Sequence, residues 1–323
     1  MDEIVVIATK RETGIRDVAA DVTVLDDVYL QSTLSTSLAD SFRFVPGVTH
    51  ESSGSRFGTE GITIRGIGGN RIALELDGVP LSDQFDIGNF SSATRDFADA
   101  GLLGRVEVLR GPASALYGSS AIGGVVAMRT LEPRDFATPG PTSGRIATLY
   151  RGLDASSNVQ AGVALKGSAV SLLAAGSYRE GEQADSAVLR TAADRQDYSR
   201  DAALLKLIGE NRNGHEWRIS AMRQAYDLRS DITSLLGSGR FRSTTRLEGD
   251  DRHAMDLVSA EYRFASGWFN DGVLRVFSAQ TDIRQFTLDE RAAARTPASI
   301  ERQFFFDQHT RGAELNLWRD GEL

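Results

Sequence analysis

The sequence contains no cysteine among its 323 residues, which excludes disulfide bonds and thiol chemistry. It has only four histidines, which lie far apart and form no group with Asp and Glu at metal-ligand spacing. The net charge is −8 and the basic residues form no stripe, so nucleic acid is not expected as a partner. No apolar run reaches the length of a membrane-spanning helix.

Catalytic patterns are missing as well. No nucleophile is accompanied by a base, and no paired carboxylates stand in one loop. The glycine-rich stretch at 118–124 lacks the lysine of a phosphate-binding loop and the serine spacing of a hydrolase turn. The sequence therefore predicts a protein that is not an enzyme.

Proline is also scarce, and its distribution divides the chain. Three of the seven prolines stand at positions 133–141, which predicts a linker at 133–143. Before it, three glycine-rich phrases at 61–80, 104–126 and 128–130 combine alternating apolar residues with turn residues. They predict a hairpin with a tight turn at 77–78, further strands, and one helical turn that begins after Pro112 and ends at Gly118.

These phrases resemble the plug domain of the outer-membrane receptors that are driven by the TonB protein. The matching pieces are IRG (64–66), NR (70–71), DGVP (77–80), VEVLRGP (106–112), LYG (116–118) and IGGVV (122–126), preceded by LAD (38–40) and FVPGV (44–48). Each piece is weak alone, and the ordered set is specific. The resemblance implies a mixed α/β plug domain at 21–132.

The N-terminal residues resemble the energy-coupling box of the same family. They are Asp2, Glu3, Ile4, Val5, Val6, Ile7, Ala8 and Thr9. An extended β-branched segment can add as a strand to the sheet of a partner. The resemblance implies that this partner is the C-terminal domain of TonB with its ExbB and ExbD complex. An ordinary first strand of the plug is the alternative, and 1–20 as a whole is predicted to be coupling box and flexible tether.

After the linker, the pattern changes to long strands. We expect strands near 144–152, 155–166, 169–180, 199–209, 215–229, 251–264, 271–289 and 300–318. Short turns alternate with long polar loops at 181–198, 230–250 and 290–299, as in transmembrane β-barrels. Trp217, Tyr262, Trp268, Phe269 and Trp318 are expected in an aromatic girdle at the lipid surface. A soluble all-β domain is the alternative.

Eight strands are too few to surround a plug, because an eight-stranded barrel has an interior filled by side chains. The family closes its barrel with twenty-two. We therefore expect 144–323 to be the first eight or so strands of an incomplete antiparallel barrel in a longer receptor. No signal peptide precedes Asp2, which suggests that the chain starts at the mature end with Met1 added.

Two plug arginines are predicted to matter structurally. The resemblance implies that Arg65 and Arg110 face carboxylates of the barrel wall and lock the plug in place. A buried pair of this kind is strong only while both partners are present. The alternative is that both side chains are solvated beside glycine turns.

The plug sequence looks most like the receptors for haem, haemoglobin and transferrin-type iron sources. His50, the plug's one histidine, follows PGV in a polar loop, and it is a candidate axial ligand for a transported haem. Arg56 and Phe57 are further ligand-binding candidates in that loop. No permanently bound cofactor and no resident metal are expected.

The sequence thus predicts a TonB-dependent receptor of a Gram-negative outer membrane that imports an iron-containing ligand, haem or haem from a host haemoprotein. A ferric siderophore or cobalamin is the first alternative cargo. The second alternative is a surface adhesin, or a docking site for phage and bacteriocin, that does not transport.

Overall fold

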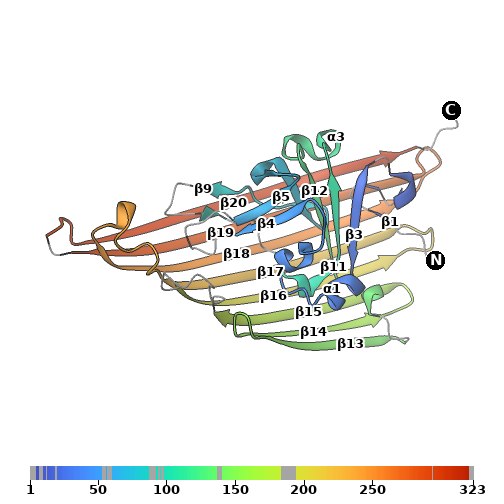
Figure 1. Ribbon diagram of the computed structural model, residues 1–323. Helices are drawn as coiled ribbons and strands as arrows, with labels where there is room; N and C mark the ends of the chain where they lie inside the picture. The colour runs from blue at the N-terminus through green and yellow to red at the C-terminus, as the bar shows by residue number, and fades with distance from the viewer. Residues whose placement is uncertain are drawn as a thin grey trace.

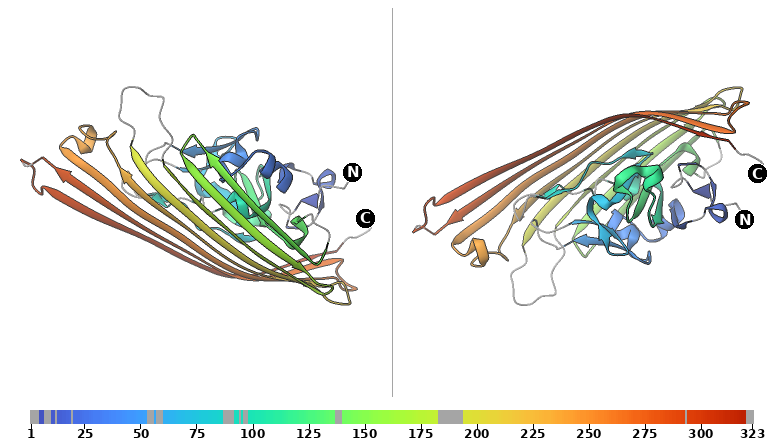
Figure 2. Two further views of the ribbon diagram at one scale, coloured as in Figure 1. Left: turned by 90° about the horizontal axis from the view of Figure 1, so that it is seen from below. Right: turned by 90° about the horizontal axis from the view of Figure 1, so that it is seen from above.

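The structure is a computed structural model, and it describes residues 5–6, 10–11, 13–18, 20–52, 56, 60–86, 92–93, 95, 98–136, 140–182, 194–292 and 294–319. A small mixed domain, here called the plug, sits against the concave face of a large twisted sheet, here called the wall (Figures 1 and 2). The long strands of the wall extend beyond the plug at one end.

A five-stranded sheet forms the centre of the plug. Its order is β3 (Asp21–Asp26), β11 (Leu103–Arg110), β12 (Gly124–Thr130), β7 (Ile72–Leu76) and β8 (Val79–Pro80). β12 runs parallel to β7, and β11 runs antiparallel to β3 and β12. All residues of β7 and β12 are buried, because the core covers one face and the cluster around Tyr117 covers the other. The alternating sequence at 72–76 predicts a half-buried strand, but in the structure both faces of this strand are buried.

Smaller elements complete the plug. They are β1 (Val5–Val6), β2 (Thr13–Gly14), α1 (Asp27–Ser32), α2 (Leu38–Phe42), β4 (Val48–Ser52), β5 (Glu60–Ile64), β6 (Ile67–Gly68), β9 (Phe85–Asp86), β10 (Ser92–Ala93) and α3 (Ser114–Tyr117). Asp26 and Ser37 cap α1 and α2 by accepting backbone N–H bonds. Among the described residues, no helix is long and apolar enough to cross a membrane.

The predicted hairpin at 61–80 is wrong in its pairing. β5 pairs with β4 and β6, whereas β7 pairs with β8 and β12, so the two halves belong to different sheets. The tight turn is confirmed: Asp77 and Gly78 have φ of 49° and 74° and connect β7 to β8. The helical turn that ends at Gly118 is confirmed as α3.

The wall contains the eight predicted strands in sequential antiparallel order. They are β13 (Thr142–Arg151), β14 (Ser156–Lys166), β15 (Val170–Glu182), β16 (Arg195–Glu210), β17 (Glu216–Asp231), β18 (Thr244–Phe264), β19 (Asp271–Arg291) and β20 (Ser299–Trp318). β13 and β20 lie at opposite edges, so these strands form an open sheet and not a closed barrel.

The long loops were predicted too long, because charged residues at their margins belong to strands. β18 begins at Thr244, inside the loop expected at 230–250, and β16 begins at Arg195. Ion pairs between neighbouring strands hold these charges, as in Arg246 Nη1 to Glu290 Oε1 at 3.4 Å. Opposite charges facing each other across two strands are favourable.

Apolar side chains gather on the outward face of the wall toward the short turns. The exposed members include Ile146, Tyr150, Val159, Val163, Leu165, Tyr178, Leu205, Ile219, Val258, Tyr262, Leu274, Val276, Leu315 and Leu317. Further along the same face, Asp256 pairs directly with Arg223 and forms an ion pair of 3.1 Å. Trp217 and Tyr262 are paired residues near the short turns, where the aromatic girdle was predicted. The band has the features of a lipid-facing surface.

We expect Leu205→Arg to destabilise the receptor in outer membranes by about 2–4 kcal/mol, because the side chain lies within the apolar band. The measurement is the fraction of receptor that remains folded at each urea concentration. Folded and unfolded receptor are separated on a gel by their different mobility without boiling. Asp197→Arg lies on the same strand face, further toward the long loops where the side chain is 55% exposed, and serves as the control. If the two substitutions lowered the stability equally, Leu205 would not lie in a lipid-facing band.

Candidate functional site

The interface between plug and wall concentrates the buried charges of the chain. The wall adds apolar side chains to the plug core, among them Ala164, Leu173, Leu204, Met222 and Leu257. Around this apolar centre, wall cations meet plug carboxylates. The pairs are Lys206 with Asp77, Arg218 with Glu132, Arg145 with Asp27 and Arg151 with Asp40.

Lys206 is the most deeply buried of these cations. Its side chain is 2% exposed, and Nζ lies 3.1 Å from Asp77 Oδ2. Asp77 also accepts hydrogen bonds from Thr130 N at 2.9 Å and Thr130 Oγ1 at 2.6 Å. Burial alone would raise the pKa of Asp77, but Lys206 and Thr130 hold the pKa below its usual value. The carboxylate therefore stays charged at neutral pH and fixes the β7–β8 turn to the wall.

A cavity of about 410 Å³ separates plug and wall beside this pair. Arg275 projects from β19 into it, donates from Nε to Glu261 at 3.1 Å, and reaches the carbonyl oxygen of Gly78 from Nη1 at 3.4 Å. A Cβ on Gly78 would lie 2.3 Å from the guanidinium carbon. Glycine is favoured here for its left-handed φ, and a Cβ would force the Arg275 guanidinium to move.

Lys10 joins the N-terminal segment to both bodies at the same cavity. Its Nζ lies 2.7 Å from Glu75 Oε1 on plug strand β7 and 3.3 Å from Glu314 Oε1 on wall strand β20. It also lies 4.4 Å from the ring centroid of Tyr117. Burial raises the pKa of Glu75, although Lys10 opposes that shift.

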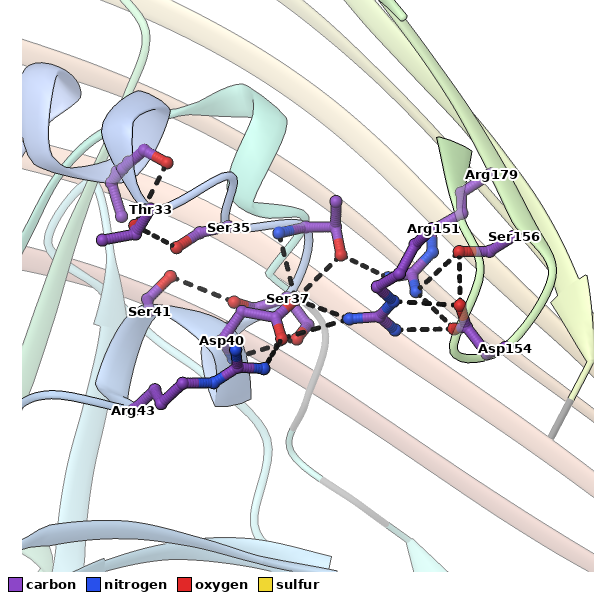
Figure 3. A network of polar contacts seen from close by, with 12 residues as sticks. Thr33, Ser35, Ser37, Asp40, Ser41, Arg43, Arg151, Asp154, Ser156 and Arg179 are labelled. Carbon is purple, nitrogen blue, oxygen red and sulfur yellow. Dashed lines mark hydrogen bonds and ion pairs between the residues drawn. The ribbon is translucent and has the colours of Figure 1, made fainter. Parts of the chain in front are cut away.

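A second polar network connects the α1–α2 segment to the far end of the first wall hairpin (Figure 3). Arg151 lies between plug Asp40, with Nη1 to Oδ1 of 3.2 Å, and wall Asp154, with Nη2 to Oδ2 of 2.6 Å. Arg179 donates to Thr36 Oγ1 at 2.7 Å and to Asp154 Oδ2 at 2.8 Å. Asp154 thus orients two wall arginines toward the plug.

Arg56 makes the most deeply buried ion pair in which the plug supplies the cation. Nε donates to Asp251 Oδ2 at 2.7 Å, and a second bond joins Nη2 to the other carboxylate oxygen. The guanidinium also donates to Thr287 Oγ1 and to the Phe286 carbonyl, both at 2.7 Å. A residue predicted to bind ligand is therefore used here to attach the plug to the wall.

Arg65 and Arg110 bind the plug itself. Arg65 Nη2 lies 2.6 Å from Asp21 Oδ2, and Arg110 Nη1 lies 3.0 Å from Asp21 Oδ1. Arg110 Nε also donates to the Pro46 carbonyl at 3.0 Å. Within the described chain both arginines pair with the carboxylate of Asp21 on β3, and the expected carboxylates of the wall are not observed beside them. The role of Arg65 and Arg110 as a lock stays a prediction.

His50 lies in β4 and lines a small cavity together with Gln84 and Arg95. The free volume is about 10 Å³, roughly the room that one water needs. This cavity does not accommodate a porphyrin, so its geometry gives no support to a haem ligand role for His50, which stays a prediction. Phe57 lies outside the described residues.

The coupling segment is described only in part. Val5–Val6 pairs antiparallel with Thr13–Gly14, as a two-stranded ribbon ahead of β3. Asp2, Glu3, Ile4, Ile7, Ala8 and Thr9 lie outside the described residues. The role of the segment in coupling stays a prediction.

Sequence reasoning missed the wall cations. Lys206 stands in the apolar strand ALLKLIG, and with the period of two it faces inward beside Leu204. A single lysine on the inner face of such a strand was a usable signal, because a buried ammonium requires an acid partner. Its partner, Asp77, was named only as a turn residue.

Comparison with known proteins agrees with this arrangement. Residues 14–125 match the family described as TonB-dependent Receptor Plug Domain. The chain is 36% identical over 143 residues to a hemin receptor of Yersinia enterocolitica, covering 44% of this chain and 20% of that protein. It is 32% identical over 154 residues to the vitamin B12 transporter BtuB of Vibrio vulnificus, covering 48% and 24%. The chain spans about a fifth to a quarter of these curated relatives.

Solved structures share the fold at low identity. A mutant of the ferric enterobactin receptor PfeA from Pseudomonas aeruginosa has a TM-score of 0.67 and 18% identity, with 97% of this chain and 48% of that chain covered. The ferripyoverdine receptor of the outer membrane of the same organism has a TM-score of 0.66 and 13% identity, with 96% and 51% covered. Residues 14–125 thus belong to the plug-domain family of the TonB-dependent receptors, and plug and wall together share the fold of solved outer-membrane receptors over a plug and part of a barrel. This is a family of receptors and transporters, not of enzymes.

We expect Arg56→Ala to lower the stability of the docked plug by about 3–5 kcal/mol, because it leaves Asp251 buried without its cation. Calorimetry of the purified receptor should show an earlier first transition. The double variant Arg56→Ala with Asp251→Asn should recover part of the loss.

The matched control is Arg223→Ala, which breaks an ion pair whose side chains are 57% and 52% exposed. Screening by water makes such a pair weak, so little change is expected. If the two alanine variants shifted the transition equally, Arg56 would not anchor the plug.

Proposed function

We propose that this receptor imports an iron-containing ligand, haem or haem taken from host proteins, and that a pull by TonB on the N-terminal segment drives the import. The observation that carries the proposal is the set of ion pairs between plug and wall. Ion pairs and hydrogen bonds have discrete alternative partners, including water, so an interface built from them can be released and re-formed.

Lys10 supports the coupling step. It directly follows the proposed coupling box at 2–9 and contacts both plug Glu75 and wall Glu314. A pull on that box therefore acts first on a contact that ties β7 to β20. Asp77, two residues beyond Glu75, holds the next plug–wall pair with Lys206. TonB, with ExbB and ExbD, would bind the box by strand addition.

Similarity to the hemin receptors, at 36% and 37% identity over 143 residues, supports haem as the cargo. The similarity to BtuB over a comparable length supports cobalamin as the second candidate, and a ferric siderophore is a third. A docking function without transport remains the alternative from another class. One structural neighbour, FpvAI, was solved in complex with pyocin S2.

Deletion of residues 2–9 from the receptor is expected to abolish cargo uptake while cargo binding at the cell surface persists, because the strand that TonB binds is lost. Uptake and surface binding are measured on the same cells with labelled cargo.

Replacing residues 2–9 by a Gly-Ser segment of equal length controls for tether length and should abolish uptake equally. A variant with Lys10→Arg keeps the charge and should retain uptake. Uptake that survives the deletion would rule out coupling through this segment.

Haem titrated into the purified receptor is expected to give a saturable red-shifted Soret band, because a histidine ligand alters the haem absorption. Loss of the band in His50→Ala would assign the ligand to His50. His215→Ala, at a short turn of the wall, is the control. No band in any protein would contradict free haem as the cargo and favour cobalamin or a siderophore.

A further inference from the structure

A buried cation faces the small cavity between the β4–β5 hairpin and β7. The residues that line the cavity include His50, Ile62, Ile72, Leu74, Gln84 and Arg95. The Arg95 residue is 7% exposed. Its Nη1 donates to the Ile72 carbonyl at 2.8 Å and to the Gly69 carbonyl at 3.3 Å. The guanidinium is thus held in place by backbone oxygens.

Those contacts leave the guanidinium without a carboxylate in direct contact, although Asp83 favours its charged form from a greater distance. In the part of the chain that the structure describes, no carboxylate lies within ion-pair distance of this guanidinium, and its buried Nε has no hydrogen-bond partner. Carbonyl oxygens satisfy N–H donors but carry no full charge. Buried charges in proteins are as a rule paired with an opposite charge, because isolated burial is costly.

We propose that this cavity binds a single small inorganic anion of halide size, with Arg95 as its cationic ligand. The imidazole of His50 and the amide of Gln84 line the same space and can contribute N–H donors. The apolar walls from Ile62, Ile72 and Leu74 suit a weakly hydrated ion.

Size selects the class of anion. A free volume of about 10 Å³ leaves room for a single water or a single monatomic anion. A carboxylate or phosphate would have to stay at the mouth, so the carboxylates of a cargo are not the expected occupants. The bound anion would connect Arg95, which holds β7 and the 69–71 turn, to the β4–β5 hairpin.

Arg95 keeps its charge under the conditions of the proposed binding. Burial lowers the pKa of Arg95 to about 10, a shift that Asp83 opposes. The guanidinium therefore remains protonated at neutral pH. The reduced pKa reports an unfavourable environment that a bound anion would improve.

The first test uses the unmodified receptor. Crystals grown in sodium bromide should show an anomalous peak within contact distance of the Arg95 guanidinium. Hydrogen exchange of peptides covering 48–52 and 60–64 is compared in chloride and in gluconate at equal ionic strength. Exchange through local opening should slow by the factor 1 + [chloride]/Kd, which is about tenfold at ten times Kd.

Two variants separate the site from general salt effects. Arg95→Gln should abolish the chloride dependence of exchange, and Arg95→Lys should retain part of it. The matched control is Arg71→Gln, which removes an exposed arginine from the neighbouring turn and should leave the chloride dependence unchanged.

Three outcomes would overturn the proposal. The first is a bromide map without a peak at Arg95, which would leave water as the occupant. The second is equal protection from hydrogen exchange in chloride and in gluconate. The third is protection from exchange by acetate but not by bromide. None of these measurements involves cargo or transport, so their failure would leave the proposed import function untouched.

Discussion

The docking of the plug depends on the pairing of charges that are buried between it and the wall. Lys206 is the clearest case, because an ammonium that is 2% exposed would be strongly unfavourable without Asp77. Asp77 in turn is fixed by Thr130, the last residue of β12, so one carboxylate connects the turn after β7, the end of β12 and a wall strand. The plug must take a depth and a rotation within the wall that bring Asp77 and Lys206 into contact.

In most of these ion pairs the wall supplies the cation and the plug supplies the carboxylate, and this division has a physical cause. Most wall partners are arginine or lysine, whose long side chains span the gap from a strand, whereas most plug partners are short carboxylates beside turns or helix ends. Asp40 shows the arrangement: its carboxylate accepts hydrogen bonds from Thr36 N and Oγ1 within the plug while Arg151 reaches it from the wall. Arg65 and Arg110 were expected to extend from the plug to carboxylates of the wall, but both pair with Asp21 within the plug.

Much of the wall could be predicted from the sequence, because alternation along a strand depends on local residue order. The strand ends were missed where charges such as Arg246 and Glu290 looked like loop residues and yet pair across strands, at 3.4 Å. The pairing of 61–80 was missed because turn residues indicate a reversal but do not reveal which strand comes alongside. Interface partners such as Arg56 and Asp251 are separated by 195 residues, and no local pattern links them.

Once the contacts of Lys10 with Glu75 and Glu314 are broken, the position of β3 determines how a force from the N-terminus would reach the central sheet of the plug. Among the described strands, β3 lies at the edge of its sheet and pairs with β11 alone, so it can separate without breaking another of these strand pairs. It also carries Asp21, so its departure would leave Arg65 and Arg110 without their carboxylate at the same moment. β12, by contrast, lies between β11 and β7 with every residue buried. Because hydrogen bonds on both sides and a covered face protect β12, a pull limited to β3 would remodel the edge of the plug before it disturbed the centre.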